Sequence, residues 1–157
     1  MPGTLEETAT AISRVISICR DAEQGFRGAA NAARDPEMRE LFLAYSDQHG
    51  SFAATLQEAV KALGYDAESP AGLGGMIYAG WIELKALVTS HDRHGILVEA
   101  ERGEDWILSA YRDAADKSLP VGIRYLVDAQ LAEVQKIHDH LKERRDATAP
   151  KHTNGAD

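Results

Sequence analysis

The sequence predicts an all-α fold in which two antiparallel helical hairpins, joined by a long crossover, form a four-helix bundle. Apolar residues recur at alternating intervals of three and four residues along four long segments. Short breaks separate the first segment from the second and the third from the fourth, as in helical hairpins. The connection between the hairpins is too long for a turn and suits a crossover along the bundle, and no stretch alternates like a β-strand.

The first helix is predicted over residues 5–33. Thr4 and Glu7 form a capping box at its start. Its core-facing stripe consists of Ile12, Ile16, Cys19, Glu23, Phe26 and Ala30. Asp35 and Pro36 then predict the start of the second helix, because an N-cap acid followed by proline is typical of a first turn.

The second helix is predicted to end at Gly64, since glycine readily terminates helices. The connection over residues 64–90 contains a Ser-Pro pair and a glycine-rich run, which break regular structure. A short amphipathic helix is expected late in this connection, over about residues 76–88. The crossover therefore carries an extra helix.

The third long helix is predicted over residues 91–117 with Ser90 as its cap. A Leu-Pro pair breaks the chain, and the fourth helix follows over about residues 120–146. We expect one domain over residues 1–147 and a disordered polar tail over residues 148–157.

Composition limits the classes of partner. The net charge of −8 argues against a nucleic-acid binder, which needs Lys and Arg to contact phosphates. No apolar run approaches the roughly 20 residues of a membrane span, and the N-terminus lacks the features of a signal peptide. One cysteine cannot form an internal disulfide. We expect a cytoplasmic protein without nucleic-acid or membrane partners.

A short motif occurs twice, each time on the first helix of a hairpin. Ala22-Glu23-Gln24-Gly25 recurs as Ala100-Glu101-Arg102-Gly103. Glu23 and Glu101 both interrupt apolar stripes. A buried carboxylate costs several kcal/mol unless it is paired, protonated or bound to a metal. The duplication therefore predicts a polar site inside the bundle.

Helical rise tests whether polar side chains meet at this depth. Reflection through the hairpin turns places His49 near the level of Glu23 and His138 near the level of Glu101, with Glu104 one turn from Glu101. Carboxylates and imidazoles are suitable ligands for iron or manganese. The candidate metal ligands are Glu23, His49, Glu101, Glu104 and His138.

Two functions remain open at this point. Di-iron bundles use one Glu from each of two helices and Glu-x-x-His from each of the others. Here the second helix has Ser46-x-x-His49 and the fourth has Gln135-x-x-His138, so both bridging glutamates are missing. The chain is either a metal-binding protein with a degenerate site or a non-catalytic interaction or structural module without metal, in which the glutamates specify packing. The sequence does not decide whether it is an enzyme.

Several other side chains have structural interpretations. Trp81, on the short crossover helix, is the candidate anchor of an interface, with this helix packed either on its own bundle or on a second copy, and we expect a homodimer. An unidentified protein partner belongs to the interaction-module hypothesis. Cys19 is expected to be a small buried residue and not a nucleophile. His140 is expected to face solvent, because i and i+2 positions of a helix lie on different faces.

Four runs also carry a resemblance to a known family. They are CRDAEQGF at 19–26, GWIELK at 80–85, EAERGED at 99–105 and QLAEVQKIH at 130–138. Over nearly all of residues 5–145 the chain resembles a bacterial ferritin-like four-helix-bundle family known as a domain of unknown function. The resemblance implies the ferritin-like fold and a bacterial source, often in stress-related settings, but no settled activity. It carries the superfamily's metal ligands over to Glu23, Glu101 and, loosely, His138.

Overall fold

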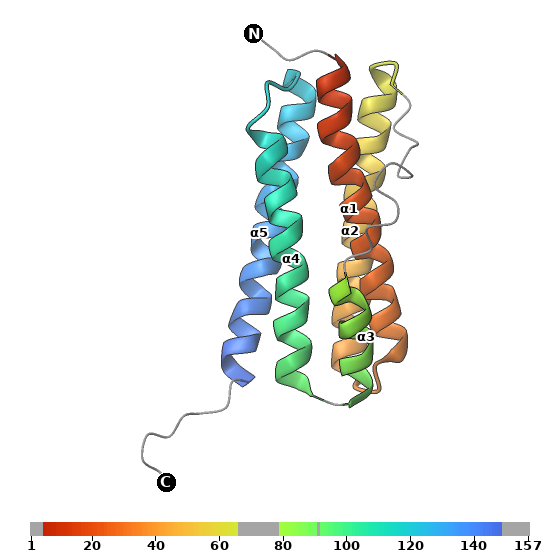
Figure 1. Ribbon diagram of the computed structural model, residues 1–157, viewed down its shortest axis with the longest axis vertical. Coiled ribbons are helices and arrows are strands. Elements are labelled where there is room, and N and C mark those ends of the chain that lie inside the picture. The colour runs from red at the N-terminus through yellow and green to blue at the C-terminus, as the bar shows by residue number, and fades with distance from the viewer. Residues whose placement is uncertain (1–4, 66–78, 91, 149–157) are drawn as a thin grey trace.

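The computed structural model describes residues 5–65, 79–90 and 92–148, and the regular structure of these residues is entirely helical. The helices are α1 (Leu5–Ala32), α2 (Pro36–Ala62), α3 (Ala79–Ser90), α4 (Arg93–Ala115) and α5 (Val121–Thr148). The long helices α1, α2, α4 and α5 lie along one axis, with the short α3 beside them (Figure 1). The predicted all-α class is confirmed, and no strand occurs in the described residues.

The four long helices pack in a ring. α1 lies beside α2 and α4 beside α5, while α1–α4 and α2–α5 contacts close the ring and α3 packs against α1 and α4 (Figure 1). α4 begins at the end of the molecule where α1 is followed by α2, because Arg93 pairs with Asp35 at 3.3 Å and with Glu37 at 2.9 Å. α2 ends at the opposite end of the molecule from the start of α4, so α2 and α4 run in the same direction (Figure 1).

Local capping explains where α2 and α4 begin. The Asp35 side chain accepts a hydrogen bond from the Glu37 amide at 2.9 Å, and Pro36 occupies the first turn, as predicted. The α4 cap is Asp92, which accepts from the Gly95 amide at 3.0 Å. The prediction of a Ser90 cap was wrong, because Ser90 is the last residue of α3 and donates to the Leu87 carbonyl.

The other predicted boundaries differ by a few residues. Gly64 follows α2 with a φ of 89°, the left-handed conformation that glycine favours. Thr148 was assigned to the tail, but it ends α5, where its hydroxyl donates to the Arg145 carbonyl at 2.9 Å. The Thr4 cap, the glycine-rich part of the crossover and the tail from 149 onward lie outside the described residues.

The core between the helices is mainly aliphatic and aromatic. Its largest fully buried side chains are Tyr111, Phe26, Phe42, Ile12, Met38, Leu56, Leu84, Leu97, Ile107, Leu141, His49 and Glu104. His49 and Glu104 differ from the rest of this set, because an imidazole and a carboxylate need compensation when they leave water. Their burial identifies the part of the core that carries polar chemistry.

Candidate buried polar site

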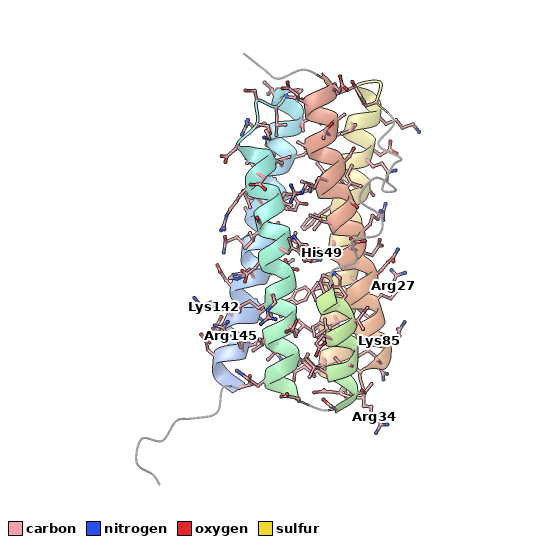
Figure 2. The ribbon with its side chains drawn as sticks, viewed as in Figure 1. Arg27, Arg34, His49, Lys85, Lys142 and Arg145 are labelled. Atoms are coloured by element: carbon pink, nitrogen blue, oxygen red, sulfur yellow. The ribbon has the colours of Figure 1, made fainter. Side chains whose placement is uncertain are left out.

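The deepest polar contact joins α2 to α4 across the ring. The side chains of His49 and Glu104 are both 0% exposed, and His49 Nε2 lies 2.8 Å from Glu104 Oε1. Figure 2 shows His49 in the middle of the bundle, far from both ends. Two helices that are not neighbours in the ring therefore meet in the core through this pair, in addition to the Arg93–Glu37 ion pair at the end of the molecule.

The backbone fixes which ring nitrogen of His49 carries a proton. Nδ1 lies 2.6 Å from the Tyr45 carbonyl oxygen, which only accepts hydrogen bonds, so Nδ1 is protonated. Burial alone would lower the pKa of His49, but the charge of Glu104 and the contacts with Glu104 and the Tyr45 carbonyl together raise it. The surroundings of His49 therefore favour the protonated form of its imidazole.

The pair is incompletely satisfied by the rest of the protein. The contact between Nε2 and Oε1 is short, but neither atom has a well-aligned hydrogen bond within the described residues. Glu104 Oε2 also lacks a hydrogen-bond partner among these residues. Glu104 Oε2 is thus the atom without any partner, beside an ion pair whose two facing atoms are close but poorly aligned.

A second buried network surrounds the Tyr111 hydroxyl. Tyr111 donates to Gln130 Oε1 at 2.6 Å, and Cys19 Sγ lies 3.3 Å from the same hydroxyl. Burial, opposed by the Tyr111 hydrogen bond and aided by the charge of Glu104, raises the pKa of Cys19 to about 12. Cys19 is therefore a buried neutral thiol, as the sequence analysis expected. With His49 and Glu104, each long helix contributes at least one of these polar side chains.

Glu101 and His138 meet at the seam between α4 and α5. Glu101 Oε2 lies 3.6 Å from His138 Nε2, and Glu101 Oε1 also pairs with Arg145. His138 Nε2 is closer still to Asp105, at 2.6 Å. Asp105 was not singled out in the sequence analysis, although it lies one helical turn from Glu101 on the same face. This cluster reaches solvent, whereas the His49–Glu104 pair does not.

Glu23 does not join either group. Its carboxylate pairs with Arg20 at 2.9 Å and with Arg27 at 3.9 Å, both on α1, and its side chain is 21% exposed. It lies against Gly50 of α2, where a Cβ atom would come within 2.2 Å of Glu23 Oε2. The expected convergence of Glu23 with the other four candidates is corrected, because position 23 faces the α1–α2 seam.

The five candidate ligands therefore occupy three places. Glu23 lies at the α1–α2 seam, Glu101 and His138 at the α4–α5 seam, and His49 and Glu104 in the core. Among residues 5–65, 79–90 and 92–148, no group of three or more His, Cys, Asp or Glu side chains is placed to hold a metal ion.

The glycines of the duplicated motif, and not its glutamates, have a shared structural role. A Cβ atom on Gly25 would lie 2.3 Å from Trp81 Cδ2, and one on Gly103 would lie 2.7 Å from Trp81 Cη2. Both glycines thus contact one indole, while the motif alanines, Ala22 and Ala100, are fully buried. The informative signal was the glycine at the same position of each copy.

Trp81 is consequently not an interface anchor. Its side chain packs between α1 and α4 of its own chain and is only 7% exposed. The indole also meets Phe26 edge-on, with ring centroids 4.9 Å apart. The expectation of a homodimer loses this support and stays a prediction.

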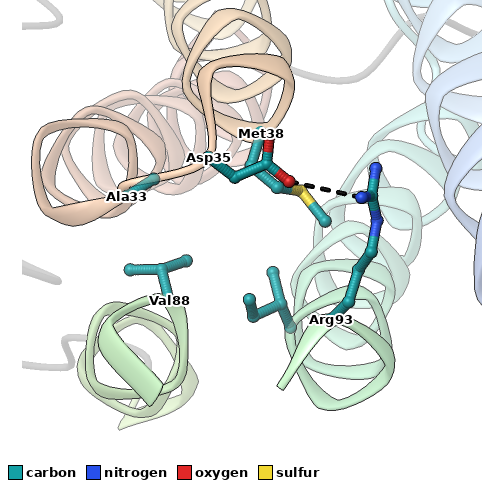
Figure 3. A pocket seen from close by; sticks show the side chains of 6 residues that line it. Ala33, Asp35, Met38, Val88 and Arg93 are labelled. Carbon is teal, nitrogen blue, oxygen red and sulfur yellow. Dashed lines mark hydrogen bonds and ion pairs between the residues drawn. The ribbon is translucent and has the colours of Figure 1, made fainter. Parts of the chain in front are cut away.

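A pocket of about 150 Å³ opens at the end of the molecule near the α1–α2 turn. Figure 3 shows the Asp35–Arg93 ion pair beside apolar side chains. The lining residues are Ala33, Asp35, Met38, Val88, Arg93 and Ile96. None of the five candidate ligands lines it, so this pocket is separate from the buried polar pair.

Comparison with known proteins identifies a family. None of the helices in the described ranges has the length and apolar character needed to span a membrane. No curated protein matches the chain. A family model described as "Domain of unknown function (DUF2383)" matches residues 7–117, a segment from α1 through α4 that includes both copies of the motif, Trp81, His49 and Glu104. The chain therefore belongs to the DUF2383 family.

Proposed function

We propose that this protein is a ferritin-like four-helix bundle that holds one divalent metal ion, iron or manganese, between His49 and Glu104. The carrying observation is the set of three buried ligand atoms, His49 Nε2 and both Glu104 oxygens, without a well-aligned hydrogen bond among the described residues. The ring of two hairpins, with α2 and α4 parallel, supports the ferritin-like assignment.

The donor chemistry fits a transition metal of this class. Imidazole and carboxylate are common ligands of manganese, iron and zinc. Histidine ligands usually donate their second ring N–H to a carbonyl or carboxylate, which fixes the tautomer. His49 has this arrangement, because Nδ1 bonds the Tyr45 carbonyl and Nε2 points at Glu104. The ligating nitrogen is therefore already oriented.

Charge at the pair also favours a cation. Glu104 neutralises His49 while the imidazole is protonated, and that proton must leave Nε2 before the nitrogen can ligate. A divalent ion would replace the lost positive charge and use the unpartnered Glu104 Oε2. When bound, the ion would supply positive charge and redox capacity at side chains shielded from solvent.

Cobalt titration tests the proposal, since Co²⁺ takes the same ligand types and its visible spectrum reports coordination. The metal-free protein should bind about one Co²⁺ per chain. His49→Gln and Glu104→Gln should each weaken binding at least tenfold, or about 1.4 kcal/mol. Glu23→Gln is the matched control, because Glu23 lies outside the pair, and it should bind as wild type does. Binding that survives both core substitutions would place the ion elsewhere, and no binding would reject the proposal.

One observation favours the alternative of an interaction or structural module without metal. Each candidate acid already has a basic partner: Glu23 pairs with Arg20, Glu101 with Arg145 and Glu104 with His49. Under this alternative the core pair only specifies packing. Replacing both members with leucine should then leave stability unchanged or raise it, because buried ion pairs are often no better than apolar side chains. Added metal should not change the melting temperature of wild type.

A further inference from the structure

We propose that α3 is a cover that opens over the buried pair, that Trp81 is its latch, and that ions and solvent reach His49 and Glu104 between α1 and α4 when α3 lifts. The route itself does not depend on the bound species. The inference that a metal ion uses this route rests on the proposed function.

The position of α3 supports this assignment. α3 packs against α1 and α4 and makes no backbone contact with α2 or α5 (Figure 1). It therefore lies over the seam that closes the ring on one side. Trp81, Leu84 and Val88 face inward at helical spacing, whereas Ile82 is 67% exposed. One narrow apolar face attaches this helix to the bundle.

Trp81 forms the deepest part of that attachment. Its indole lies between Gly25 of α1 and Gly103 of α4, and a Cβ atom on either glycine would come within 2.7 Å of a ring carbon. The absence of side chains at these two positions makes the room that the indole fills. Gly103 is also the residue before Glu104, so the latch lies directly beside the α4 member of the pair.

Aromatic rings connect the latch to the α2 member. Trp81 contacts Phe26 with centroids 4.9 Å apart, and Phe26 contacts the imidazole of His49 with centroids 5.4 Å apart. Phe26 is fully buried, and the Trp81 indole meets its ring edge-on. Removal of the indole would thus expose the ring that shields His49.

α3 is also the helix best suited to separate locally. It has 12 residues, whereas the other four helices have 23 to 28, and it is attached by three buried apolar side chains and the partly buried Leu87. Proteins open in local units, and elements with few buried contacts open at the lowest cost. An ion can reach a fully buried pair only through such an opening. Separation of any other described helix would expose more buried apolar side chains than separation of α3.

The test measures access to His49 without metal. Diethyl pyrocarbonate modifies accessible neutral imidazoles, and peptide mass spectrometry can follow His49 beside the exposed His140 as an internal reference. Trp81→Ala should accelerate modification of His49 relative to His140 at least tenfold. Ile82→Ala changes an outward residue of the same helix and should leave the ratio unchanged.

Two further arms separate local opening from general loss of stability. Leu56→Ala removes a fully buried side chain of α2 that is not part of the α3 contact, so it serves as the destabilised control. Low urea concentrations should not change the rate in Trp81→Ala, because local opening exposes little surface, whereas a rate due to global unfolding would rise with urea. Equal acceleration in Leu56→Ala and Trp81→Ala, or an unchanged rate in Trp81→Ala, would overturn the proposal.

The cobalt experiment distinguishes the two proposals. Trp81→Ala should bind Co²⁺ at least tenfold faster than wild type if α3 controls entry. Accelerated His49 modification without any cobalt binding would retain the cover and reject the metal. Cobalt binding at the same rate in both proteins, with His49 still protected, would retain the metal and reject the cover.

Discussion

The glycines of the duplicated motif provide the most sharply defined perturbation. A Cβ atom on Gly25 would lie 2.3, 2.6 and 2.6 Å from three ring atoms of Trp81, distances that require a shift of the indole or of α1. Gly28, one turn further along α1, would meet only Lys85 Cδ at 4.0 Å, an ordinary contact. The two positions share a helix and differ in what an added methyl group contacts.

The expected effects of alanine at these positions have opposite signs. Replacing glycine by alanine inside a helix stabilises it by about 1 kcal/mol, and Gly28→Ala should show this gain. Gly25→Ala has the same gain but also overpacks the core, which costs about 1–3 kcal/mol. The difference in unfolding free energy between the two variants isolates the packing cost. We expect a packing cost in the upper half of this range, because the neighbouring side chain is a large ring held between two helices.

Urea unfolding followed by circular dichroism measures this difference. The same comparison in a Trp81→Ala background completes a double-mutant cycle. Without the indole, Gly25→Ala should become stabilising and match Gly28→Ala. Equal stability of the two variants in the presence of Trp81 would refute the claim that the motif glycines leave the space that the indole occupies.

Two other predictions concern titration and thiol chemistry. The pKa of His49 is raised in the folded protein, so the pair's contribution to stability is complete below the unfolded value of about 6.5 and declines as pH rises through the folded value. The unfolding free energy should therefore start to fall as the pH rises above about 6.5, before Cys and Tyr titrate in unfolded chains. His49→Gln should lack this decline, and an identical slope in the variant would contradict the raised pKa of His49. Cys19, fully buried with a pKa of about 12, should react with a thiol reagent only when the protein unfolds, and rapid labelling under native conditions would show that Cys19 is accessible in the folded protein.

The helices could be predicted from the sequence because their signals are local. Apolar spacing and the Asp35-Pro36 start depend on residues within a few turns of each other. The α4 cap was harder, because Ser90 and Asp92 both suit a first turn, and the choice depends on where α3 ends. That end is fixed by packing against α1 and α4, which the local sequence does not contain.

The candidate site was predictable only where one hairpin determines it. Glu101 and His138 belong to α4 and α5, so helical rise and the position of one turn place them at the same level. The contact between His49 and Glu104 joins two hairpins and depends on their relative rotation, which no single stripe reports. Glu23 lies at the edge of its stripe, and a small rotation of α1 directs it to the α1–α2 seam.

Anomalous diffraction from crystals grown with Co²⁺ tests the metal proposal most directly, because it locates the ion without reference to activity. We expect one strong peak per chain beside His49 Nε2 and the Glu104 carboxylate, lost in Glu104→Gln and kept in Glu23→Gln. Peaks confined to the solvent-reaching Glu101–Asp105–His138 cluster, or no ordered peak at all, would contradict a metal site in the core.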